Sequence, residues 1–211
     1  MDNLERSRLI SSGLLQMKAI KFNFKEPFIW ASGWKSPMYC DNRISLSDCH
    51  LRSMIRDAYV EVIQKKFPEV EIIAGVATGA IAQGALVADK LNFPFIYVRE
   101  KAKDHGMKKL IEGKLEPGQK TVIIEDLIST GGSSLKVAEE LSKAQANVLG
   151  MVAIFSYEFS TAIEKFNQNN CQLYTLSTFS MLQDVALVDG YITGEDVEKL
   201  SEWRKNPQAY Q

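Results

Sequence analysis

Short apolar runs alternate with amphipathic helical stretches through the middle of this chain, and this alternation constrains its fold more than any other feature. The apolar runs predict strands over Ile72–Ala77, Phe95–Val98, Thr121–Glu125, Val148–Phe155 and Leu173–Ser177. The stretches between them predict helices over Ala80–Leu91, Ser133–Ala144 and Ser160–Asn167. Strands joined through helices form parallel sheets, because parallel neighbours need a long crossover connection. We therefore expect an α/β fold whose helices cover both faces of a mainly parallel sheet, with ligands beyond the carboxyl ends of the strands.

The flanking segments extend this pattern at both ends. We expect a first helix over Leu4–Ile20, extended pieces over Phe28–Ala31 and Met38–Asp41, and a helix that runs from an N-cap at Ser47 to Lys66. A polar loop is expected from Arg99 to about Pro117. Two further helices are expected over Ser180–Val188 and Thr193–Lys205, with a cap at Thr193.

Composition narrows the class of protein without naming it. At roughly 150 residues per domain, the 211 residues fit a single domain. The 25 Lys+Arg and 26 Asp+Glu nearly balance, which argues against a nucleic-acid-binding protein, since those usually carry a positive excess. The polar start MDNLERSRLI and the absence of a long apolar run predict no secretory signal and no membrane span, so we expect a cytoplasmic protein.

The cysteines have no spacing typical of a disulfide framework or a zinc site. We expect a structural role for Cys40, Cys49 and Cys171, and for His50, Trp30 and Trp203.

The loop after Thr121–Glu125 carries the strongest local signal. Two adjacent carboxylates, Glu125 and Asp126, end the apolar run. The segment Ser129–Ser134, which consists of hydroxyl residues and glycines, then leads into a helix. Glycine lets the backbone approach a ligand, and the free N–H groups of a helix N-terminus bind phosphate. The acids can accept hydrogen bonds from a diol, so the loop favours a ribose 5-phosphate over an ordinary capped helix. There is no GxxxxGK[ST] and no GxGxxG after a strand, which excludes two common nucleotide motifs.

This loop resembles the PRPP-binding motif of the type I phosphoribosyltransferases. The resemblance implies PRPP binding by the motif, whose residues here are Glu125, Asp126, Leu127, Ile128, Ser129, Thr130, Gly131, Gly132 and Ser133. It also implies the type I phosphoribosyltransferase fold, in which helices flank a central, mainly parallel sheet. One domain over residues 1–211 would then comprise a small N-terminal hood (about 1–45), a core (about 46–190) and a C-terminal helix (about 191–211).

A basic stretch follows the expected strand Phe95–Val98. Residues 99–114 contain six Lys+Arg and three Asp+Glu, a composition that suits either a lid over an anionic substrate or a solvated charged loop. The segment KAKDHG resembles the catalytic loop of the orotate phosphoribosyltransferase family. That resemblance implies PRPP binding by Arg99, Lys103 and His105, with Lys101 shifted by one from another basic position. It also implies catalytic roles for Lys103, His105 and Asp126, and a homodimer in which each loop reaches the neighbouring site.

The segment SGWKSP at Ser32–Pro37 is either a surface hairpin or a cover for a planar base, and it resembles the base-covering segment of the same family. The small residues of Gly75–Ala82 permit either close helix packing or backbone contacts to pyrophosphate, and by position they match the family's pyrophosphate loop.

Three positions depart from the pattern of some family members. Gly79 and Ala31 stand where those members carry lysine, and the stretch Ser156–Glu158 has no arginine for the orotate carboxylate. Ser129 and Lys35 are therefore our candidates for contacts with orotate.

The resemblance implies that PRPP and orotate give orotidine 5′-phosphate and pyrophosphate, with Mg²⁺ as cofactor. The ion would be held mainly by pyrophosphate and ribose oxygens, so we expect no protein-ligated metal. Two alternatives stay open: a phosphoribosyltransferase for another base, such as a purine, and a non-catalytic regulator that binds PRPP or nucleic acid. We expect no partner among membranes or nucleic acids.

Overall fold

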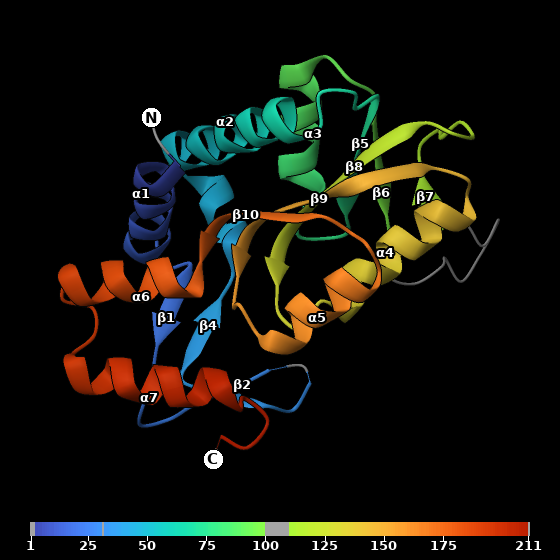
Figure 1. Cartoon of the computed structure of the whole chain (residues 1–211). Coiled ribbons are helices and arrows are strands. Elements are labelled where there is room, and N and C mark those ends of the chain that lie inside the picture. The colour runs from blue at the N-terminus through green and yellow to red at the C-terminus, as the bar shows by residue number, and fades with distance from the viewer. Residues whose placement is uncertain (1–2, 31, 100–109, 211) are drawn as a thin grey trace.

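The computed structural model describes residues 3–30, 32–99 and 110–210, and a six-stranded sheet lies at its centre (Figure 1). The strands in spatial order are β10 (Leu173–Thr178), β9 (Asn147–Ser156), β8 (Lys120–Ile128), β5 (Ile72–Val76), β6 (Phe95–Val98) and β7 (Ile111–Glu112). All neighbours are parallel except β6 and β7, which pair antiparallel at one edge. The predicted α/β class with a mainly parallel sheet is confirmed.

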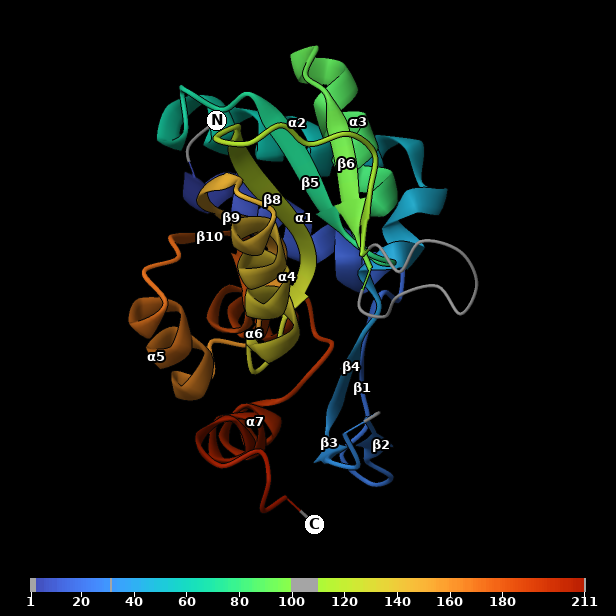
Figure 2. The ribbon, with the colours of Figure 1, turned by 90° about the vertical axis from the view of Figure 1, so that its right-hand side faces the viewer.

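Helices cover both faces of this sheet. On one face lie α1 (Asn3–Gln16), α2 (Cys49–Lys66) and α3 (Ile81–Leu91), and on the other lie α4 (Gly132–Lys143) and α5 (Ser160–Gln168) (Figures 1 and 2). Next to α1 and β10 packs α6 (Phe179–Val188), which in turn contacts α7 (Gly194–Lys205). Within the described parts of the chain, no helix has the length and apolar character to cross a membrane.

The apolar strands form the core because both of their faces are covered. Every residue of β5 is buried, and Val122, Ile123 and Ile124 of β8 are fully buried. The predicted strand over Phe95–Val98 is confirmed residue for residue, while β8 and β9 extend beyond the predicted ends. Strand β8 runs three residues past Glu125, so the two carboxylates lie within the strand.

A narrow ribbon projects from the carboxyl edge of the sheet (Figure 2). We call residues 20–40 the hood ribbon. In it, β1 (Ile20–Phe22) pairs with β4 (Met38–Cys40), and β2 (Phe28–Ile29) pairs with β3 (Lys35–Ser36), both antiparallel. By contrast α1, which precedes the ribbon, packs against α6 and β10 in the core.

Three local predictions are wrong. The first helix ends at Gln16, and Ile20 already belongs to β1. Ser47 ends a 3-10 helix, η1 (Asn42–Ser47), so the carboxylate of Asp48 caps α2 by accepting a hydrogen bond from the backbone N–H of Leu51 (2.7 Å). The expected loop after Arg99 contains β7, which adds to the edge of β6.

The residues expected to be structural divide into two groups. Trp203 is buried and Trp30 is half-buried, and the two rings contact each other, as expected for packing residues. All three cysteines are free thiols: Cys40 is buried, Cys171 half-buried and Cys49 exposed. His50 is exposed next to Cys49 at the start of α2, so neither of these two side chains belongs to the core.

Candidate active site

A cavity of about 570 Å³ opens at the carboxyl ends of β5, β6 and β8. The chain leaves β5 toward β6 on one side and later returns to β8 on the other, so the connections diverge between β5 and β8. Such a topological switch point is where open parallel sheets bind ligands. The cavity is lined by Val76, Ala77, Thr78, Gly79, Val98, Arg99, Leu110, Glu125, Asp126, Leu127, Ser129, Thr130, Gly131, Ser133, Lys136, Val137, Glu139 and Glu140.

The two adjacent carboxylates differ in their surroundings. Glu125 is only 4% exposed, and its carboxylate accepts hydrogen bonds from the backbone N–H of Asp126 (2.9 Å) and the hydroxyl of Ser134 (2.7 Å). Burial, followed by the charge of Asp126, raises the pKa of Glu125 well above its usual range. Asp126 is half-buried, which leaves its carboxylate as the more accessible acceptor in the cavity.

Side chains from distant parts of the chain hold the backbone of this acidic pair. The hydroxyl of Tyr59, on α2, donates a hydrogen bond to the carbonyl of Glu125 (2.5 Å). The amide of Asn42, on η1, donates one to the carbonyl of Asp126 (2.6 Å). Both donors are buried, so the carboxylates are presented from a backbone that is fixed on two sides.

The loop after β8 forms a small cradle at the start of α4. Gly131 has a φ of 75°, and a Cβ there would lie 3.0 Å from the ring of Phe166 on α5, so both conformation and space favour glycine. No side chain caps α4, and the first N–H groups of a helix have no partner within it. Ser129, Thr130, Gly131 and Ser133 line the cavity beside these groups, an arrangement suited to a phosphate.

The remaining members of the predicted motif differ in their position. Leu127 also lines the cavity, whereas Ile128 is fully buried and Gly132 is not part of the lining. The sequence reading also offered the hydroxyl of Ser134 to a ligand, and this is wrong, because that hydroxyl donates to Glu125 inside the protein.

The connection from β5 to α3 forms the opposite wall. A Cβ on Gly79 would lie 2.2 Å from the Oδ2 atom of Asp126, so the carboxylate occupies the space that any side chain at position 79 would need. The Ala77–Thr78 peptide bond is cis. A Cβ on Gly75 would lie 3.0 Å from the carbonyl oxygen of Ala80, which confirms close helix packing at that position. Residues 76–79 line the cavity, and their contact with pyrophosphate stays a prediction.

Arg99 lies at the cavity rim, where its guanidinium is 3.6 Å from the Glu112 carboxylate. Lys101, Lys103 and His105, predicted to bind the leaving pyrophosphate or to lie beside it, are outside the described residues. The sequence reading missed Lys136, which lines the cavity from α4. Its spacing of three residues from Ser133 places both on one helical face, a signal that the sequence does contain.

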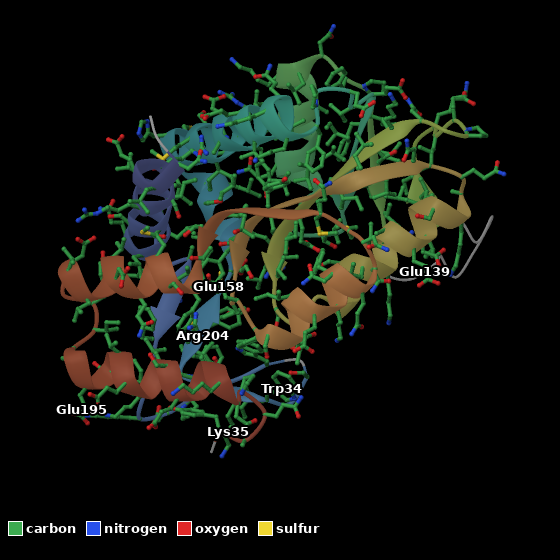
Figure 3. The ribbon with its side chains drawn as sticks, viewed as in Figure 1. Trp34, Lys35, Glu139, Glu158, Glu195 and Arg204 are labelled. Carbon is green, nitrogen blue, oxygen red and sulfur yellow. The ribbon has the colours of Figure 1, made fainter. Side chains whose placement is uncertain are left out.

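The structure does not bring Lys35 into the cavity lining. Its side chain is exposed on β3, and Figure 3 places Lys35 and Trp34 far from Glu139, which lines the cavity. In the part of the chain that the structure describes, no group of three or more His, Cys, Asp or Glu side chains could hold a metal ion.

The position of the cavity agrees with the similarity of this chain to known proteins. A family model described as "Phosphoribosyl transferase domain" matches residues 50–183, which include β5, β8 and the loop between β8 and α4. This chain is thus a phosphoribosyltransferase with the type I fold.

Individual relatives narrow the class. The orotate phosphoribosyltransferase of Porphyromonas gingivalis is 53% identical over 203 residues, covering 96% of this chain and 97% of the relative. That of Bacteroides fragilis is 52% identical over 211 residues, covering 100% and 99%. Among solved structures, the orotate phosphoribosyltransferase of Aeropyrum pernix matches with a TM-score of 0.74 and 26% identity, over 87% of this chain and 99% of that one. The chain belongs to the orotate phosphoribosyltransferase family.

Proposed function

We propose that this protein transfers the phosphoribosyl group of PRPP to orotate, giving orotidine 5′-phosphate and pyrophosphate in the de novo synthesis of UMP. The observation that carries the proposal is the pairing of Asp126 with the phosphate cradle, at the switch point of a chain about half identical to orotate phosphoribosyltransferases over its full length. A carboxylate beside a phosphate cradle matches the diol and the 5-phosphate of one ribose.

Each part of the site then has a role. The carboxylate of Asp126 accepts hydrogen bonds from the ribose hydroxyls, and the buried Glu125 supports it. Residues 129–133 hold the 5-phosphate through backbone N–H and hydroxyl groups. As the bond from ribose C1 to pyrophosphate breaks, negative charge grows on the leaving group, and Arg99, Lys103 and His105 stabilise it. The base nitrogen of orotate attacks C1, and that nitrogen is already nearly anionic, so no strong general base is needed.

The residues present fit a magnesium ion held mainly by the substrate. Mg²⁺ keeps several waters and usually takes one or two carboxylates together with phosphate oxygens, so a cage of protein ligands is not required. Asp126 would supply such a carboxylate at the cavity. When bound, the ion would neutralise charge on the pyrophosphate.

Three further assignments belong to the same proposal. The protein forms a homodimer in which the basic loop of each subunit serves the neighbouring site. Ser129, which lines the cavity, and Lys35, which lies outside the lining on the hood ribbon, contact orotate. The expected location remains the cytoplasm.

The test is the fall in orotate ultraviolet absorbance when PRPP is added to purified protein with and without Mg²⁺. We expect a fall that requires both PRPP and Mg²⁺, and loss of turnover in Lys103→Ala without loss of fold. Turnover of adenine or hypoxanthine in place of orotate would favour a purine enzyme. PRPP binding by titration without turnover of any base would favour the regulator.

A further inference from the structure

Two segments outside the matched domain contact each other. The family model matches residues 50–183, which excludes both the hood ribbon and α7. Trp30 of the ribbon and Trp203 of α7 nevertheless contact each other, with ring centroids 5.8 Å apart at an angle of 88°. Edge-to-face contact of this kind is favourable between aromatic rings.

These two rings belong to a larger aromatic cluster, which we define as Trp30, Tyr157, Phe159, Phe179 and Trp203. Tyr157 and Phe159 follow β9 and stack at 5.4 Å, while Phe179 begins α6. Trp203 is 2% exposed and lies 5.5 to 5.9 Å from each of the other four rings. The cluster therefore joins the ribbon, the end of β9 and both C-terminal helices, with Trp203 at its centre.

Polar contacts fasten α7 to the core beside this cluster. The guanidinium of Arg204 donates to the carboxylate of Glu158 (3.1 Å) and to the hydroxyl of Ser180 (3.0 Å). The same carboxylate accepts bonds from the N–H and the hydroxyl of Ser180, at the start of α6. Figure 3 shows Glu158 and Arg204 close together between α6 and α7. These bonds hold α7 in place, so that Trp203 can support Trp30 of the ribbon.

The hood ribbon has little stability of its own. Its strands pair only in twos, and two-stranded antiparallel pairs are marginally stable in water without further packing. The hairpin at its tip closes through backbone bonds from Trp30 N–H to Trp34 (2.9 Å) and from Gly33 N–H to Trp30 (2.8 Å). The indole N–H of Trp30 bonds within the ribbon, to the carbonyl of Met38 (3.4 Å), so Trp30 contacts the core through its aromatic ring.

We propose that α7 is a clamp that sets the position of the hood ribbon, with Trp203 as the positioning residue. The inference rests on the proposed function in one respect, namely that the ribbon covers the base when orotate is bound. The position that α7 gives to the ribbon then governs the affinity for orotate and not that for PRPP. The phosphate end of the substrate binds within the matched domain and is independent of α7.

The test compares Trp203→Leu with Trp203→Phe and Lys199→Gln. Leucine removes the aromatic ring. Phenylalanine keeps a six-membered ring and loses the pyrrole ring, whose N–H has no partner among the described residues. Lys199 is on the same helix but forms an exposed ion pair with Glu195 (2.7 Å), so its variant is the control. Hydrogen exchange is followed at the amides of Trp30 and Gly33, and steady-state kinetics give KM for each substrate.

In Trp203→Leu we expect exchange of those two amides to quicken by about tenfold or more while amides of β8 stay protected. The KM for orotate should rise several-fold with the KM for PRPP unchanged, and Trp203→Phe should restore both readouts. If Trp203→Leu does not fold, Arg204→Gln tests the same clamp from its polar side. Unchanged exchange at the tip would overturn the clamp. Faster exchange with both KM values unchanged, or with both raised equally, would overturn its link to the base. If the wild type does not use orotate, the proposed function fails, yet the exchange experiment still decides whether α7 holds the ribbon.

Discussion

The cradle and the hood ribbon both lie beyond the carboxyl ends of the sheet strands but are built in opposite ways. The cradle comes from one continuous segment, residues 129–133, which joins the end of β8 to the first turn of α4. The ribbon is held through Trp30, whose ring contacts Tyr157, Phe159 and Trp203, residues that lie more than 120 positions further along the chain. A short stretch of sequence is therefore enough to predict the cradle, whereas the position of the ribbon depends on contacts between distant parts of the chain.

The largest expected effect tests the cradle region at its accessible acid. Asp126→Asn keeps the size and the backbone bond from Asn42 but weakens the acceptor for the ribose hydroxyls. We expect kcat/KM to fall by about 100-fold, as for loss of one preorganised polar group, with little change in the thermal midpoint. Glu139→Gln, which alters another acid of the cavity lining, should stay near wild type. Equal losses in both variants would show that net charge, and not the position of Asp126, matters.

A smaller loss of activity is expected from a substitution in the connection from β5 to α3, which forms the opposite side of the cavity. In Gly79→Ala the new Cβ would need the space of the Asp126 carboxylate, which must then rotate away. Because the carboxylate is the free end of a side chain, we expect about a tenfold fall in kcat/KM with stability nearly kept. Gly194→Ala is the control, since a Cβ there meets nothing within 4 Å. Wild-type kinetics in Gly79→Ala would contradict the observed orientation of Asp126.

The acidic pair beside the cradle also depends on distant contacts, from Tyr59 and Asn42, which makes the contrast with the ribbon smaller. Tyr59→Phe removes the bond to the Glu125 carbonyl inside the core. We expect unfolding free energy to fall by about 1 kcal/mol or somewhat more in urea titrations. Tyr174→Phe, which loses only an exposed and long bond to Gln172 (3.4 Å), should lose almost nothing. Equal effects would mean that the buried bond adds no stability.

One sequence-local feature, a helix cap, stabilises the start of α7. Thr193 and Asp196 form a capping box at the start of α7, as the sequence predicted for a cap at Thr193. Thr193→Ala should cost about 1 kcal/mol of helix stability and raise hydrogen exchange in α7 before the core strands. Thr161→Ala, an exposed change on α5, serves as the comparison. Unchanged exchange in α7 would mean that tertiary contacts alone hold the helix.

The smallest effect is a change in pH dependence. Burial and the nearby Asp126 raise the pKa of Glu125 in the folded protein, so the folded state holds this proton more tightly than the unfolded chain. Wild-type stability should therefore fall as pH rises from the usual pKa of glutamate to the raised value. Glu125→Gln lacks this titration, so its urea midpoints should fall less over that range. Parallel curves for the two proteins would exclude Glu125 as the source.

Local rules predicted what lies close together along the chain. The alternation of runs predicted the strands β5, β6, β8, β9 and β10 but not β7, because a buried parallel strand must be apolar throughout. The glycines and hydroxyls of residues 129–133 indicated the cradle for a similar reason, since the backbone conformation and the free N–H groups arise within a few residues. Ser47 and Ser134 were misread because a hydroxyl near a helix start has several possible partners, and the choice depends on the surrounding packing.

The sequence by itself determined the strands of the parallel sheet, the glycine- and hydroxyl-rich loop after β8 and the family to which the chain belongs, since each depends on residues that are neighbours in the chain. Only the tertiary structure decided that Asp126 is the accessible acid, that Gly79 makes room for it, and that Tyr59 and Asn42 hold its backbone. It also brought Trp30 against Trp203, 173 residues apart by number. Such contacts follow from how whole helices and strands pack, and no local pattern carries that information.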